Sequence, residues 1–226
     1  MGDKQQLVIF LVALLFSVCL HEAAHGWVAW RNGDPTAKLA GRITLNPVPH
    51  IDIFGSILFP ALLLWSGSGV LLAWAKPVPV NHRNFRNPRK GFAWVSISGP
   101  GSNLLLAAIA AAVIHIWGAV GAGLGSQGDS HGSVRIALPI VLLLIVLVKV
   151  NVYLALFNML PIPPLDGGHF LIGVLPHSQS VALQRIAPFG MLIIMGLAIS
   201  PVLQALIMPA ANLIFQLLGL SWIVNF

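Results

Sequence analysis

The stretch His21-Glu22-Ala23-Ala24-His25 lies inside an apolar run that begins near residue 7. Two histidines four positions apart lie on one face of a helix, so both imidazoles can reach one metal ion. The glutamate between them lies beside that metal, where it can act as a general base. Glu22 is the only glutamate in the chain, and a charged side chain at membrane depth usually marks a functional site. The pattern therefore predicts a metal-dependent hydrolase site within a membrane helix.

The composition indicates a polytopic membrane protein. Hydrophobic residues make up 57% of the 226 residues and charged residues 8%, whereas soluble domains carry about 25% charged residues. A soluble fold of this length could not bury so much apolar surface. The net charge of +6 falls mostly in short loops between apolar runs, where positive side chains meet anionic lipid headgroups. We therefore expect the lipid bilayer, and no nucleic acid, as a partner.

The apolar runs predict an all-α fold with four to six transmembrane helices. Helices are expected at about residues 5–30, 91–117 and 136–160, with additional membrane helices within 185–226. The run from residue 7 to 30 would be about 36 Å long, which is enough to cross a bilayer. No small-residue cleavage site follows residues 7–20, so we expect a retained helix rather than a signal peptide.

We expect a single membrane domain over residues 1–226 with its core at 5–175. Partial alternation at 38–45 could form a short strand.

A catalytic zinc site needs a third protein ligand and an open position for water. Asp166 is the best candidate, because it follows an apolar run and precedes Gly167 and Gly168, which let the backbone approach closely. The prolines before it stiffen the segment and could fix its direction. The remaining carboxylates are Asp3, Asp34, Asp52 and Asp129.

Three motifs in this order resemble the site-2 protease family of intramembrane zinc proteases. They are HEAAH at residues 21–25, GPGSN at 99–103 and NMLPIPPLDGG at 158–168. Gly101 departs from the family pattern, in which a larger apolar residue is commoner. The resemblance covers residues 8 to about 173. It corresponds to the short form of the family, without a PDZ or CBS domain, because the chain has no polar block long enough for one.

The resemblance implies that His21, His25 and Asp166 bind one Zn²⁺ per chain and that Glu22 is the catalytic base. It also implies that Asn158 contacts the substrate backbone or the oxyanion. The expected function is hydrolysis of peptide bonds in or near transmembrane segments of membrane-protein substrates, as in regulated intramembrane proteolysis. Two alternatives are a polytopic membrane transporter and a non-catalytic metal-binding scaffold. Transporters often show repeated halves, which are not evident here, and the intact Glu22 argues against the scaffold.

Convergence of the ligands constrains the topology. For Asp166 to reach a metal held by His21 and His25, the residues after Arg31, the loop 76–90 and Asp166 must lie on one side of the membrane. Residues 54–75 therefore cannot make one net crossing, and we expect a re-entrant segment that turns at residues 66–69. The family resemblance suggests a β-hairpin there, and the alternative is a plain transmembrane helix. Positive residues concentrate on this side, which predicts an active site facing the cytoplasm in an inner or plasma membrane.

Several further polar residues have two possible roles each. His50 either approaches the cytoplasmic mouth of the site or belongs to a loop turn. Lys149 and Asn151 lie in the middle of a membrane helix, where they could line a polar interior, although Lys149 could instead extend to the interface or pair with a carbonyl. His169 is either a neighbour of the zinc ligands or a surface residue. Asn103 is expected to pack helices rather than to take part in catalysis.

Overall fold

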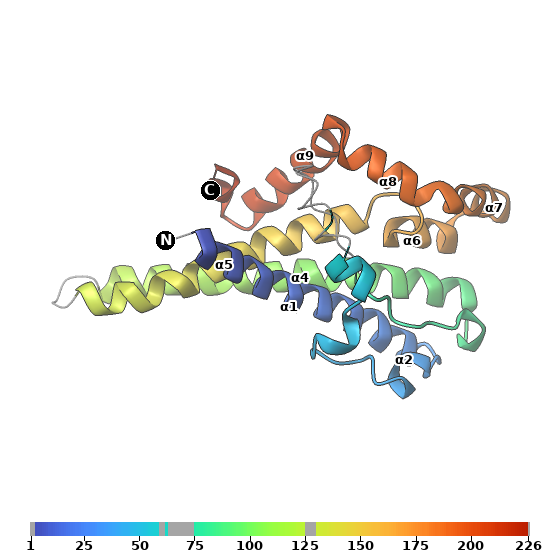
Figure 1. Ribbon diagram of the computed structural model, residues 1–226, viewed down its shortest axis with the longest axis horizontal. Helices are drawn as coiled ribbons and strands as arrows, with labels where there is room; N and C mark the ends of the chain where they lie inside the picture. Colours follow the sequence, from blue (N-terminus) through green and yellow to red (C-terminus); the bar gives the residue numbers. More distant parts are fainter. Residues whose placement is uncertain (1–2, 59–61, 63–74, 125–129, 226) are drawn as a thin grey trace.

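The computed structural model describes residues 3–58, 62, 75–124 and 130–225, and all regular structure within them is helical. Three long helices, α1 (Asp3–Arg31), α4 (Pro88–Leu124) and α5 (Ser130–Asn158), pack side by side along the longest axis of the molecule (Figure 1). Four helical stretches of the described chain are long and apolar enough to cross a membrane: 5–31, 88–118, 139–158 and 177–198. The prediction of an all-α polytopic membrane protein is confirmed.

Shorter helices connect and cover these three. They are α2 (Thr36–Leu39), η1 (Val48–His50), η2 (Ile53–Leu58), η3 (His82–Asn84), α6 (Asp166–Val174), α7 (His177–Ile186), η4 (Ala187–Phe189), α8 (Gly190–Ala198), α9 (Pro201–Leu217) and η5 (Ser221–Asn225). The strand considered for residues 38–45 is wrong. Residues 36–39 instead form α2, and Gly41 follows with a φ of +64°, a left-handed conformation that glycine adopts without strain and that ends the helix.

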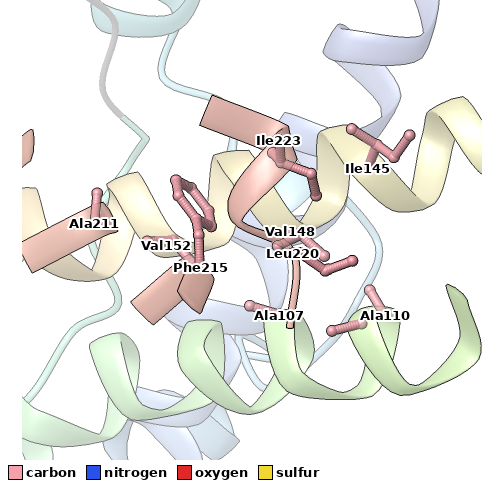
Figure 2. Packing of buried hydrophobic residues seen from close by; sticks show 10 residues of the cluster. Ala107, Ala110, Ile145, Val148, Val152, Ala211, Phe215, Leu220 and Ile223 are labelled. Atoms are coloured by element: carbon pink, nitrogen blue, oxygen red, sulfur yellow. The ribbon is translucent and has the colours of Figure 1, made fainter. Parts of the chain in front are cut away.

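The apolar core lies between α4, α5 and the C-terminal helices. Small side chains of α4 let α5 approach closely, which is how van der Waals packing holds helices together inside lipid. Phe215 of α9 is fully buried in this cluster, so the C-terminal helix is anchored to the long helices (Figure 2). The buried members are Ala107, Ala110, Ala111, Ile145, Val148, Val152, Ala211, Phe215, Leu220 and Ile223.

The loops that follow α1 and precede α4 lie at the same end of the molecule. The backbone N–H of Lys76 donates to the carbonyl of His50 at 2.9 Å, and that of Arg86 donates to Asn32 at 3.0 Å. Arg42 adds side-chain hydrogen bonds to the carbonyls of Lys76 and Pro77 at 2.6 and 3.2 Å. Residues 50 and 76 therefore lie at the same end of the molecule, which is the arrangement that the topology argument requires. The β-hairpin and its turn at 66–69 lie outside the described residues.

Asp34 joins these loops through a fully buried carboxylate. It accepts hydrogen bonds from the Thr36 hydroxyl and backbone N–H at 2.5 and 3.1 Å, from the Asn81 N–H at 2.7 Å and from the Asn84 amide at 2.8 Å. Burial acts to raise the pKa of this carboxyl, but the donors, led by Thr36, hold the pKa below its ordinary value. Asp34 thereby fixes the loop 75–87 against the end of α1.

Replacing Asp34 by Asn is expected to destabilise the protein at neutral pH by about 1–3 kcal/mol, because hydrogen bonds to an ionised acceptor are lost. A depressed pKa contributes stability above the pKa of Asp in the unfolded chain, and that contribution disappears as pH falls through the lower folded pKa. Thermal unfolding in detergent should therefore show a gap between parent and Asp34→Asn that narrows from pH 7 towards pH 3. Thr36→Val, which removes one donor and keeps the carboxylate, is the matched control and should lose less. A gap that is constant with pH would contradict the assignment.

Candidate metal centre

Two helices bring three potential metal ligands together. His21 and His25 lie one turn apart on α1, and Asp166 is the first residue of α6. The Nε2 atoms of the two histidines are 3.0 Å apart, and the Asp166 Oδ2 atom lies 3.1 Å from that of His21 and 3.3 Å from that of His25. Both imidazoles are buried. The structure therefore brings these three side chains together.

The spacing and chemistry of the three ligand atoms fit a zinc ion. Tetrahedral zinc with bonds of about 2.0–2.1 Å separates its ligand atoms by about 3.3 Å, close to the three distances observed. The Asp166 Oδ2 atom is also buried and accepts no hydrogen bond from any described residue. A buried carboxylate oxygen without a donor needs a positive partner. Two imidazoles and one carboxylate form the ligand set of a catalytic zinc site, which keeps a fourth position open.

Hydrogen bonds on the far side of each ring orient the imidazoles. The Nδ1 atom of His21 lies 2.6 Å from Asn103 Oδ1, and that of His25 lies 2.7 Å from the carbonyl of Val95. Because both partners are acceptors, each Nδ1 carries the proton. Each Nε2 is therefore left with a lone pair for a metal.

A chain of buried side chains extends this contact across three helices. Asn103 on α4 donates to Asn151 on α5 at 2.7 Å, Asn151 donates to Ser17 on α1 at 2.8 Å, and Ser17 donates to the carbonyl of Ala13 at 2.7 Å. Ser17, Asn103 and Asn151 are all fully buried. Asn103 therefore packs helices, as expected, and also holds His21, a role that the sequence analysis missed. The sequence did hold one sign of this role: Asn103 lies four positions after Gly99, so both lie on the same face of the helix.

Gly99 sets the distance between α4 and the two histidines. A Cβ atom at this position would lie 2.4 Å from His25 Nε2 and 2.6 Å from His21 Nε2. No side chain can be accommodated at such distances while the imidazoles keep their places. Gly101, where the sequence departs from the family pattern, has open space around it, with no atom within 4 Å of a Cβ built there.

Close backbone contacts also place Asp166. A Cβ on Gly167 would lie 2.3 Å from the Met159 carbonyl oxygen, and one on Gly168 would lie 2.3 Å from the Pro163 nitrogen. The two glycines thus let α6 fold tightly against the segment that follows α5, as the sequence predicted. At the other end of α6, the Arg89 guanidinium donates to the carbonyls of Gly173 and Leu175, which connects α6 to the start of α4.

A cavity of about 350 Å³ opens beside the three ligands, and Glu22 and Asn158 both line it. The Glu22 Oε2 atom accepts a hydrogen bond from the backbone N–H of Val78 at 2.9 Å. Within the described chain no group donates to its other oxygen. The Asn158 amide donates to the Leu154 carbonyl at 2.9 Å, which leaves its second amide hydrogen free to donate into the cavity.

Two of the remaining predicted residues have different positions relative to this cavity. His169 lines it, one turn after Asp166 on α6, with its ring centroid 5.4 Å from that of Phe92. His50 does not line it. The His50 ring is buried, and its Nε2 lies 3.0 Å from the Thr44 carbonyl, which agrees with a loop turn.

A helical membrane fold with a buried His–His–Asp cluster beside a glutamate has the features of a membrane-embedded metallohydrolase. Residues 9–200 match Peptidase family M50, and the chain belongs to this family. This confirms the resemblance to site-2 proteases and favours a peptidase over a transporter.

Named relatives agree with this family. The Bacillus subtilis (strain 168) protein named "Putative zinc metalloprotease YwhC" is 36% identical over 206 residues, which cover 89% of this chain and 85% of that protein. The proteins named "Putative zinc metalloprotease Rip2" of Mycolicibacterium smegmatis and Mycobacterium tuberculosis (strain ATCC 25618 / H37Rv) are 27% and 29% identical. Each match covers 95% of this chain and 75% of the relative. No solved structure gives a significant match.

Replacing Gly99 by Ala should abolish metal binding at the His–His–Asp cluster, because the added methyl group would occupy the place of the imidazole Nε2 atoms. Gly101→Ala, two residues along the same helix, meets open space and should bind metal like the parent. The measurement is the zinc content of the purified proteins by elemental analysis, with circular dichroism to show that both variants keep their helices. Full zinc content in Gly99→Ala would show that the ligands are not these three side chains.

Replacing Asn103 by Leu should weaken metal binding about 10–100-fold, the usual effect of removing a partner that orients a ligating histidine. Asn103→Asp keeps an acceptor for the His21 Nδ1–H and should retain more of the affinity. Competition with a chromogenic chelator measures both constants on the purified protein. Equal metal affinities of the parent and Asn103→Leu would show that Asn103 does not orient His21 for metal binding.

Proposed function

We propose that this chain hydrolyses peptide bonds in or near transmembrane segments of membrane proteins, with His21, His25 and Asp166 as ligands of one zinc ion and Glu22 as the general base. The triangle of ligand atoms beside Glu22, on a helix long enough to cross a bilayer, is the observation that carries this proposal. We further propose that residues 1–226 act as one membrane domain and that its cleavage serves regulated intramembrane proteolysis.

The residues around the cavity have distinct tasks in this reaction. Zinc in the cluster supplies a Lewis acid that lowers the pKa of a water molecule and polarises the scissile carbonyl. Glu22 accepts the proton of the attacking water and returns it to the leaving amine. The Val78 N–H holds one oxygen of Glu22 in place, so the carboxylate is already oriented. The free amide hydrogen of Asn158 can donate to the oxyanion or to the substrate backbone.

The distribution of charge supports a cytoplasmic active site in an inner or plasma membrane. The end of the molecule that carries the loops 31–52 and 75–90 holds eight positive side chains: Arg31, Lys38, Arg42, Lys76, Arg83, Arg86, Arg89 and Lys90. Short loops rich in Lys and Arg remain on the cytoplasmic side. Lys38 also lies 3.8 Å over the ring of Trp30, and tryptophan beside a cation is typical of the membrane interface. Water would reach the cavity from this side.

Glu22→Gln is expected to keep zinc and to lower the cleavage rate by about 10²–10⁴-fold, the usual contribution of a general base. The amide has the same shape and can still accept from Val78, so binding of metal is preserved. Asp166→Ala is expected to lose zinc and activity together. Cleavage is measured by mass spectrometry on a mixture of synthetic single-span transmembrane peptides in liposomes with the purified protein. Cleavage by Glu22→Gln at the parent rate would overturn the mechanism, and full zinc affinity in Asp166→Ala would overturn the ligand assignment.

A further inference from the structure

Lys149 is a cation at membrane depth that the proposed peptidase reaction does not use. It lies near the middle of the span Pro139–Asn158 of α5, about 14 Å from either end at 1.5 Å per residue. Its side chain is half-buried, and no described residue forms a salt bridge or hydrogen bond with it. A charged side chain in the centre of a bilayer is costly, and such residues usually face a bundle interior or a watery cavity and pair with another charged group or with a backbone carbonyl.

Among the described residues, no carboxylate is placed to pair with Lys149. Glu22 and Asp166 belong to the metal centre. Asp34 and Asp52 accept hydrogen bonds from loop residues at the end of the molecule that carries the loops. Asp3 begins α1, at the end of its span. Asp129 lies outside the described residues; it precedes Ser130, which starts α5 about 28 Å along the helix from Lys149. A second copy of this chain would bring the same carboxylates, and the five described ones would be held in the metal centre, in the loops or at the end of a span in the same way.

An apolar groove surrounds Lys149. We call it the Lys149 groove: a cavity of about 560 Å³ that is lined by α1 at Phe10 and Leu14, by α5 from Val146 to Phe157 and by α9 at Ile207. Lys149 is its single charged lining residue. Along α5 the groove extends for about 16 Å, or three helical turns. Its last residue, Phe157, is next in sequence to Asn158, which lines the metal cavity.

We propose that the Lys149 groove binds a transmembrane helix of another membrane protein that carries an aspartate or glutamate near the middle of its span. The apolar walls accept the apolar face of such a helix. Its carboxylate supplies the negative partner that no described residue gives to the Lys149 ammonium group. The low dielectric constant of the hydrocarbon makes an ion pair there much stronger than at the surface. This docking is independent of whether the bound helix is subsequently cleaved, so it stands apart from the proposed peptidase function.

A lipid headgroup fits this position less well than a helix. The hydrocarbon core is about 30 Å thick, so phosphate groups lie about 15 Å from its centre. A helix with an internal carboxylate delivers its charge at the depth of Lys149, whereas a phospholipid delivers it at the surface. The described walls between Val146 and Phe157 are also mainly apolar on both sides of Lys149, with the Tyr153 hydroxyl as their one other polar side-chain group, so a headgroup would find few polar contacts on the way to Lys149.

The test measures association between the full-length protein and synthetic transmembrane peptides in phosphatidylcholine vesicles at pH 8, by energy transfer from a donor dye on the N-terminus of the protein. The peptides are leucine-rich single spans with Glu, Gln or Lys at the centre. The parent should bind the Glu peptide at least 10-fold more tightly than the Gln peptide. Lys149→Met should remove this preference, and Lys149→Glu should transfer it to the Lys peptide. Lys90→Met, which changes a lysine in the first turn of α4 at the loop end of its span, should behave like the parent.

Two results would overturn the proposal. One is equal binding of the Glu and Gln peptides by the parent, and the other is a preference for Glu that persists in Lys149→Met. Adding phosphatidylglycerol to the vesicles tests the lipid alternative. If anionic lipid binds in a Lys149-dependent way and the Glu peptide shows no preference, the groove is a lipid site and the proposal fails. Unchanged zinc content in Lys149→Met confirms that loss of peptide binding is not loss of fold.

Discussion

The close approach of α4 to α1 at Gly99 is the contact on which the metal centre depends. Because Gly99 has no side chain, both imidazoles fit between the two helices with their Nε2 atoms 3.0 Å apart. Val95 and Asn103, one turn to either side of Gly99, then reach the Nδ1 atoms of His25 and His21. On α1, Ser17, His21 and His25 repeat the same spacing of four. Two helix faces with matched periodicity thus provide the cluster and its supporting hydrogen bonds.

Much of this arrangement was predictable, for identifiable reasons. Long apolar runs locate α1, α4 and α5, because a bilayer fixes the length of a span. The need for a third ligand selects Asp166 and requires the loops to share one side of the membrane. The end of α4 and the start of α5 were placed too far inward. For α4 the reason is that the glycines at 118–124 are tolerated in a membrane helix. The sequence did not reveal that Asn103 holds His21. This role requires the amide oxygen of Asn103 to face His21, and its amide nitrogen is directed to Asn151 on another helix.

Polar groups in this molecule follow different rules at depth and at the surface. Inside the helix bundle, Asn103, Asn151 and Ser17 satisfy one another, since an unpaired polar group in hydrocarbon is costly. At the loop end, arginines donate to backbone carbonyls. Arg42 donates to Lys76 in the loop 75–87, and Arg89 at the start of α4 donates to Gly173 near the end of α6. Lys149 has neither kind of hydrogen bond among the described residues. Its charge therefore indicates a binding partner outside the chain.

The distance in sequence between His25 and Asp166 has a consequence for the synthesis of the protein. A ribosome completes α1 long before it reaches α6, so a nascent chain with HEAAH already inserted in the membrane lacks the carboxylate that closes the cluster. Two histidines alone do not form the three-ligand site that zinc catalysis requires. Chain order therefore delays assembly of the centre until α4 and α5 have been made, and an incomplete chain is inert towards its neighbours in the membrane.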